Sequence, residues 1–181
     1  NKDVISSDAI HLCQQFLNSL GEIMPVILIA GNHDANLKQI TKIDSLTPTV
    51  FNLNQVHYLK DTGAYLFGNI CFVVQSVFDN KFIKADTVNV SDGIKKVCLY
   101  HGMINGCTSF NGEQYNKNMS LKLFDGFDAT LLGDIHKHQY LSKNIAYASS
   151  LIQQNFGESI DGHGMIIWNM VEDKSEFVPI E

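Results

Sequence analysis

The 181-residue chain contains no arginine, so its 13 basic residues are all lysines, and 19 acidic residues give it a net charge of −6. The guanidinium group of arginine is the side chain best suited to clamp a phosphate with two parallel hydrogen bonds. A net negative chain also attracts nucleic acid only weakly through its overall field. Any binding to nucleic acid must therefore depend on local lysines and metal ions.

The chain also lacks long apolar runs and closely spaced cysteines. No run approaches the roughly 18–20 apolar residues that span a bilayer, and the first residues show no signal-peptide pattern. Cys13, Cys71, Cys98 and Cys107 lie far apart and form no CxxC pair, which argues against a zinc knuckle. The first three fall in apolar segments, as reduced core cysteines of an intracellular protein do. We therefore expect a cytoplasmic protein without membrane association.

What the chain does contain is typical of a folded α/β protein. Hydrophobic residues make up 45% of it and charged residues 18%, and its length suits a single domain over 1–181. The apolar spacing predicts helices over 6–20, capped by Ser6 or Ser7 and ended by Gly21, and over 38–46, before Pro48. Strands are predicted over 26–30, 56–59, 64–67, 70–77, 96–101, 129–134, 145–151, 164–171 and 176–180. This pattern favours an α/β sandwich with mixed sheets.

Polar side chains gather where three of these predicted strands end. Asn-His-Asp at 32–34 follows the first strand, His101 ends the second, and Asp134, His136 and His138 follow the third. Ligands of open α/β folds bind outside the carboxyl ends of the strands. Imidazole, carboxylate and amide donors suit divalent Mn, Fe or Zn, and the lack of thiolates argues against a closed structural zinc site. The sequence therefore predicts a divalent metal site.

Three short motifs, in this order, resemble the calcineurin-like metallophosphoesterases: GNHD at 31–34, HG at 101–102 and GDIH at 133–136. Within that superfamily, LLGDIHKHQ followed by YASSLIQQNFGE (147–158) is most similar to the SbcD-type exonuclease subunits of double-strand-break repair. The resemblance covers about residues 24–170. It implies a metallophosphoesterase-type sandwich of mixed β-sheets flanked by helices.

The resemblance also implies catalytic roles for two neighbouring residues. His33 corresponds to the family's catalytic histidine, which contacts the scissile phosphate and protonates the leaving oxygen. Asp34 would hold the His33 imidazole in orientation. An imidazole suits this task because its unperturbed pKa lies near neutral pH.

Four further residues are implied as metal ligands. Asn32 and His101 correspond to ligands of the second metal, and His136 to a ligand of the first. Asp134 stands where the family has the first histidine of GHxH, and its oxygen favours a harder ion such as Mn²⁺, with Fe, Zn or Mg as alternatives. His138 is left open between a substrate contact and a solvated loop residue.

The remaining three histidines and the first part of the chain carry no such motif. We expect His11, His57 and His163 to be surface or structural residues. The family's D-x-H and GDxxH motifs, which supply three ligands including the bridging aspartate, do not occur before Asn32. This departure suggests a fragment or truncated product that lacks the first βαβ segment and binds at most one ion well.

Two functions from different classes are consistent with these observations. The first is a Mn²⁺-dependent phosphodiesterase, most concretely a DNA exo- or endonuclease that works with an ATPase partner subunit, with phosphomonoesterase or nucleotide hydrolase as variants. The second is a non-catalytic domain that keeps the fold and a partial metal site. A homodimer and a phosphoprotein substrate stay open. The composition, rich in lysine and asparagine, suggests a viral or phage genome.

Overall fold

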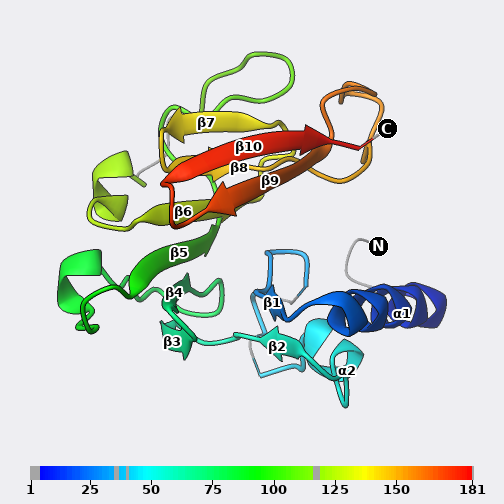
Figure 1. Ribbon diagram of the computed structural model, residues 1–181. Helices are drawn as coiled ribbons and strands as arrows, with labels where there is room; N and C mark the ends of the chain where they lie inside the picture. The colour runs from blue at the N-terminus through cyan, green and yellow to red at the C-terminus, as the bar shows by residue number, and fades with distance from the viewer. Residues whose placement is uncertain (1–4, 35–36, 40, 116–118, 181) are drawn as a thin grey trace. The chain divides into compact units, whose positions relative to one another are not determined.

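The computed structural model describes residues 5–34, 37–39, 41–115 and 119–180 and is shown in Figure 1. The chain forms two compact units, of which unit 1 comprises residues 1–61 and 76–80 and unit 2 comprises residues 62–75 and 81–181. Each unit is described by itself below. The single domain expected over 1–181 stays a prediction.

The long helix of unit 1, α1 (Ser7–Ile23), begins where the sequence predicts and ends later. The Ser6 hydroxyl caps it by accepting a hydrogen bond of 3.1 Å from the N–H of Ala9. Gly21 was expected to end the helix, but this prediction is wrong, because Gly21 lies buried inside α1. A Cβ atom on Gly21 would lie 2.6 Å from the carbonyl oxygen of Asn54, so the glycine allows close packing.

Two short parallel strands, β1 (Val26–Leu28) and β2 (Val56–Tyr58), form the sheet of unit 1. Both correspond to predicted strands, although β1 covers only the first part of the 26–30 run. The side chains of β1 and β2 are half-buried, whereas the apolar run of β1 suggested a strand covered on both faces.

The second predicted helix, over 38–46, is not formed in its described residues, so this prediction is wrong. A one-turn helix, α2 (Leu46–Thr49), starts there instead and runs through Pro48. Asp44 explains the start, because its Oδ1 accepts a hydrogen bond of 2.8 Å from the Thr47 N–H. Proline fits the first turn of a helix, where its missing N–H leaves no hydrogen bond unmade.

Unit 2 is built on a six-stranded mixed sheet with the strand order β3-β4-β5-β6-β8-β7. Four of these strands are parallel, and the edge strands β3 and β7 are antiparallel to their neighbours. The bounds are β3 (Gly63–Phe67), β4 (Ile70–Gln75), β5 (Lys95–His101), β6 (Ala129–Gly133), β7 (Gln139–Ser142) and β8 (Ile145–Tyr147). The mixed α/β architecture is therefore present.

In its described residues, unit 2 also contains an antiparallel hairpin of β9 (Gly164–Asn169) and β10 (Lys174–Pro179) and the 3₁₀ helices η1 (Ala85–Thr87) and η2 (Leu121–Phe124). The core beside the central sheet includes fully buried Val73, Cys98, Ile104, Phe124 and Tyr147. This packing holds the parallel strands in register, so their carboxyl ends form a defined edge.

The cysteines behave as their sequence context predicts. All four are free, and Cys71, Cys98 and Cys107 are buried. In the part of the chain that the structure describes, no helix is both long and apolar enough to cross a bilayer.

Candidate functional site

The carboxyl ends of β5 and β6 bring two of the predicted ligands together. These strands are parallel neighbours, and His101 at the end of β5 lies opposite Gly133 at the end of β6. The Nε2 atom of His101 lies 3.7 Å from Oδ1 of Asp134, and the two side chains are 21% and 17% exposed. The structure thus brings these two side chains together, while their metal-binding roles stay predictions.

Hydrogen bonds of the Tyr147 hydroxyl group stabilise the turn that follows β5. This hydroxyl donates a hydrogen bond of 2.7 Å to the Gly102 carbonyl and accepts one of 3.2 Å from the Ile104 N–H. Burial raises the pKa of Tyr147, so the phenol keeps the proton that it donates. On the facing strand, a Cβ atom at Gly133 would lie 2.8 Å from Nδ1 of His101. The bare Gly133 therefore leaves room for the His101 ring.

Asp134 adopts a backbone conformation that residues other than glycine rarely adopt. Its φ is 93°, in the left-handed half of the map that favours glycine. Such a conformation costs about 1–3 kcal/mol and persists only where the surrounding structure imposes it. Strain of this kind concentrates at functional sites, which fits the place of Asp134 beside His101.

Replacing Asp134 by glycine should therefore change the stability of the metal-free protein. We expect Asp134→Gly to raise the free energy of unfolding by about 1 kcal/mol in EDTA. Glycine adopts this φ without strain, and the larger loss of backbone entropy on folding of a glycine offsets part of this gain. Asp134→Asn keeps the strain and removes the charge, so it should leave that free energy near the wild-type value. Chemical denaturation of the three proteins measures this difference, and a destabilised glycine variant would contradict it.

A cavity of about 280 Å³ lies beside this pair, and its lining includes Asp134, His136, Lys137, Ser109 and Tyr115. The Lys137 ammonium lies 3.4 Å from the backbone carbonyl oxygen of Ser109, so it adds a positive charge to this wall. The Ser109 hydroxyl oxygen is buried and has no hydrogen-bond partner among the described residues. Imidazole, carboxylate and hydroxyl groups in one cavity suit a hard divalent cation and the oxygens of a phosphate.

His138, the suggested substrate contact, has a clear packing role. Its Nδ1 lies 3.1 Å from the Tyr147 carbonyl oxygen, and its ring stacks on Phe177 with centroids 3.9 Å apart. These contacts link β10 to the β7–β8 edge of the sheet. This packing role was not expected from the sequence, and the substrate role stays a prediction. His163 is buried with both ring nitrogens near backbone carbonyls, as expected of a structural histidine.

In unit 1, the loop after β1 carries the remaining predicted residues. Asn32 and His33 are exposed, and Asp34 is half-buried. Asp34 accepts hydrogen bonds of 2.7 Å from the Gly31 N–H and 3.3 Å from the Ser45 hydroxyl. Asp34 thus closes this loop and ties it to the start of α2. The role of Asp34 in orienting His33 stays a prediction. The expectation that this loop shares a site with the strand ends of unit 2 also stays a prediction.

The metal itself stays a prediction as well. Among residues 5–34, 37–39, 41–115 and 119–180, no group of three or more His, Cys, Asp or Glu side chains is placed to hold an ion. The pair of His101 and Asp134 supplies one nitrogen and one carboxylate donor. The further donors that an ion needs stay part of the prediction.

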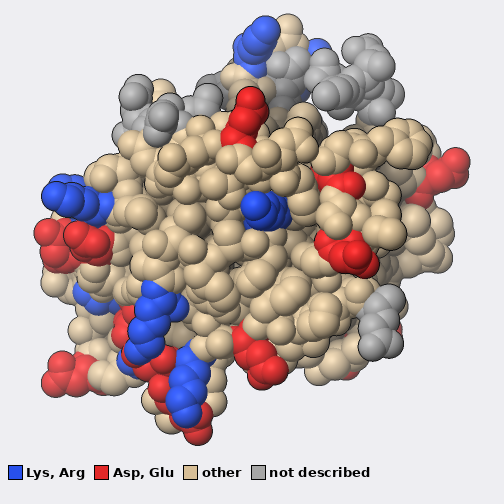
Figure 2. Space-filling model, turned by 90° about the horizontal axis from the view of Figure 1, so that it is seen from above, with Lys and Arg blue, Asp and Glu red and all other residues tan. Residues whose placement is uncertain are grey.

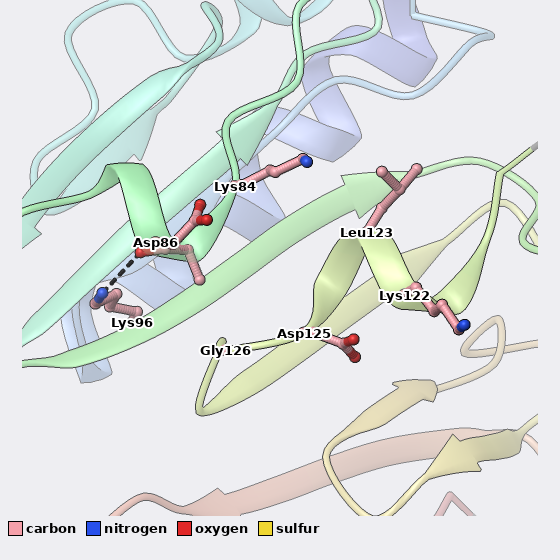
Figure 3. A pocket seen from close by; sticks show the side chains of 8 residues that line it. Lys84, Asp86, Lys96, Lys122, Leu123, Asp125 and Gly126 are labelled. Atoms are coloured by element: carbon pink, nitrogen blue, oxygen red, sulfur yellow. Dashed lines mark hydrogen bonds between the residues drawn. The ribbon is translucent and has the colours of Figure 1, made fainter.

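A second cavity of unit 2, about 450 Å³ in volume, has a different character (Figure 3). Lys84, Lys96 and Lys122 line it together with Asp86 and Asp125. The Lys96 ammonium donates a hydrogen bond of 2.7 Å to a backbone carbonyl of η1. This cavity adjoins the amino ends of β5 and β6, roughly 20 Å along the strands from their carboxyl ends. Its mixed charges do not select an anion, so the candidate site remains at the carboxyl ends.

Charges on the surface are interspersed. On the face shown in Figure 2, lysines lie among acidic side chains, and neither sign forms a continuous field in its described part. Ion pairs of unit 2 such as Lys95 with Asp128 at 3.0 Å and Lys174 with Glu172 at 3.2 Å illustrate this mixing. The expectation that binding to nucleic acid depends on local lysines and metal ions stays a prediction.

Comparison with known proteins places the chain near two viral proteins. No family model matches it. It is 39% identical over 192 residues to an uncharacterized protein of Acanthamoeba polyphaga mimivirus, covering 99% of this chain and 14% of that protein. It is 26% identical over 175 residues to "Putative phosphoesterase 244L" of Invertebrate iridescent virus 6, covering 91% of this chain and 59% of that protein. The chain thus spans less than two thirds of either relative.

The name of the iridescent virus protein describes that protein as a phosphoesterase. The source of both relatives agrees with the viral origin that the composition suggested.

Proposed function

We propose that the chain is a metal-dependent phosphoesterase domain that hydrolyses phosphodiester bonds, most concretely those of DNA. The observation that carries this proposal is the pair of His101 and Asp134, whose Nε2 and Oδ1 atoms lie 3.7 Å apart at the carboxyl ends of two parallel strands. His136 lines the adjoining cavity together with Asp134. The similarity to a protein named as a phosphoesterase supports the same class.

Each residue has one task in this proposal. His101 and Asp134 would hold one ion, with Mn²⁺ preferred. Asn32 is the further ligand that the resemblance implies for this ion, and His136 is the ligand that it implies for the other position. A divalent cation would supply an activated water for in-line attack and charge that neutralises the phosphoryl oxygens. His33 donates a proton to the leaving oxygen, and Asp34 keeps the loop of His33 closed through its hydrogen bond to the Gly31 N–H.

The nuclease activity and the ATPase partner subunit are the finest parts of the proposal. They rest on the resemblance of 131–158 to SbcD-type subunits. A competing function is a domain that binds one ion without catalysis, and the observation that favours it is that, among the predicted ligands that the structure describes in unit 2, only His101 and Asp134 lie within ion-pair distance of each other. The number of Mn²⁺ ions that bind and the hydrolysis of phosphodiester substrates distinguish the two functions.

We expect the chain to bind any ion at the His136 position weakly, and at most one Mn²⁺ ion well, at the side of His101 and Asp134. His101→Ala should weaken this binding by more than about 10-fold, because a nitrogen donor and the partner of Asp134 are both lost. His11→Ala, on the exposed part of α1, is the matched control and should bind as the wild type does. Calorimetric titration measures both effects. Two fully occupied ions, or a His101→Ala variant with wild-type affinity, would contradict this assignment.

Hydrolysis is then tested with three substrates in Mn²⁺. A phosphodiesterase cleaves bis(p-nitrophenyl) phosphate and a DNA end faster than p-nitrophenyl phosphate. The reverse preference indicates a phosphomonoesterase. A natural gene product that binds Mn²⁺ and cleaves none of the three supports the non-catalytic alternative.

A further inference from the structure

Glu158 is a buried carboxylate to which the sequence analysis assigned no role. Its side chain is 5% exposed and lies beside the candidate site. Three nitrogen atoms surround it: that of the Gln154 N–H at 2.9 Å, that of the Asn155 side-chain amide at 2.7 Å and Nδ1 of His136 at 2.7 Å. Only the last of these belongs to a predicted metal ligand.

These contacts determine which ring nitrogen of His136 carries the proton. Both carboxyl oxygens of Glu158 already accept hydrogen bonds, Oε2 from the Gln154 N–H and Oε1 from the Asn155 side-chain amide. A carboxylate held in this way presents only acceptors to the His136 ring. It follows that Nδ1 of His136 is the donor, which leaves the lone pair of a neutral imidazole on Nε2.

The loop that carries Glu158 is itself fixed around His136. The Ser150 N–H donates a hydrogen bond of 3.2 Å to the His136 carbonyl. The Gln153 side-chain amide donates one of 3.0 Å to the Glu158 carbonyl, and the Glu158 N–H donates one of 3.1 Å to the Asn155 carbonyl. The His136 side chain is 45% exposed and also lines the cavity. A rigid, buried acceptor thus holds an accessible ring.

We propose that Glu158 is a positioning residue: it fixes the Nδ1–H tautomer of His136 and keeps Nε2 available to a ligand in the cavity. A carboxylate behind a ligating imidazole orients the ring and raises the basicity of the ligating nitrogen. The part of this inference that concerns a metal rests on the proposed function. The part that concerns the tautomer stands on the contacts of Glu158 alone.

The tautomer is measured first, on the metal-free chain, by ¹⁵N NMR of the imidazole nitrogens at a pH where the ring is neutral. The wild type should show His136 with the proton on Nδ1. Glu158→Gln should shift the equilibrium toward the Nε2–H form, because the neutral amide is a weaker acceptor and presents donors of its own. Glu172→Gln, on the exposed β9–β10 turn, is the matched control and should change nothing.

Ion binding is measured next, from the broadening of the His136 ring signals by Mn²⁺. Glu158→Gln should need about 10–100-fold more Mn²⁺ for the same broadening, and Glu158→Asp, which keeps the charge, should recover part of the loss. Circular dichroism and thermal melting confirm that the variants fold. A purely structural role would lower the melting temperature without a change in tautomer.

The outcomes separate this inference from the proposed function. A wild-type His136 with its proton on Nε2, or a Glu158→Gln variant with an unchanged tautomer, overturns the inference. A changed tautomer with unchanged Mn²⁺ dependence also overturns it. A wild-type chain that binds no Mn²⁺ at any site contradicts the proposed function, while the tautomer measurement still decides the role of Glu158.

Discussion

Replacing His33 by alanine should lower the rate of phosphodiester hydrolysis by about 10²–10⁴-fold and leave Mn²⁺ binding unchanged. General acid catalysis contributes a factor of this size, and His33 supplies the proton to the leaving oxygen in the proposed mechanism. The measurement is a steady-state assay of the natural gene product that carries these residues, with calorimetry for the metal.

The comparison with His101→Ala makes this result decisive. His101→Ala should lose activity through weaker Mn²⁺ binding, so excess metal should restore part of it. Asp34→Asn should cost less than His33→Ala, because the amide oxygen can still accept the hydrogen bond from the Gly31 N–H. If excess Mn²⁺ rescued His33→Ala as it rescues His101→Ala, His33 would be a ligand and the assigned roles would be wrong.

The largest effect on stability is expected at Asp44 in unit 1. Its side chain is fully buried and lies 2.8 Å from the Lys60 ammonium. It also accepts hydrogen bonds of 2.7 Å from the Thr47 hydroxyl and 3.1 Å from the Tyr58 hydroxyl. Asp44→Ala leaves these donors without their acceptor and should lower the free energy of unfolding by about 3 kcal/mol, measured by urea denaturation.

The same carboxylate predicts how stability changes with pH. Burial alone would raise the pKa of Asp44, but the hydrogen bonds from Lys60, Thr47 and Tyr58 outweigh it and lower the pKa to about 2. The folded state thus binds the proton more weakly than the unfolded state does. The contribution of Asp44, about 2 kcal/mol, is fully present above pH ~4 and is lost as the pH falls toward ~2.

Urea titrations of the wild type and Asp44→Ala across this pH range test the assignment. The difference in unfolding free energy between the two proteins should shrink as the pH falls. Lys60→Met is a useful second variant, because the Lys60 side chain is 41% exposed and its loss should cost less than the loss of Asp44. A difference that does not change with pH would contradict the assigned cause.

Much of the architecture could be predicted because it depends on local patterns. The apolar runs that became β4, β5 and β6 are buried in the central sheet, and such runs are recognisable without tertiary information. Ser6 was recognisable as a helix cap for the same reason, since a cap contacts a backbone N–H only three residues away. The convergence of His101 and Asp134 followed from the rule that parallel strands present their carboxyl ends at one edge.

The features that sequence reasoning missed depend on partners distant in the chain. β7 is an edge strand whose residues alternate between half-buried and exposed, so it shows no apolar run. Gly21 lies inside α1 because the carbonyl of Asn54 approaches it, and no local signal reveals that approach. Glu158 follows the motif residue His136 by 22 positions, and only the fold of the intervening loop makes it an acceptor for that ring.

The sequence by itself therefore determined the class of elements, their order and the residue types available for metal and phosphate chemistry. Only the tertiary structure decided the strained φ of Asp134, the space that Gly133 leaves for the His101 ring and the contact of Glu158 with the His136 ring. The physical reason is the range of the interactions. Helix caps and apolar periodicity act over a few residues, whereas backbone strain, close packing and tautomer choice are set by atoms that only folding brings within about 3 Å of one another.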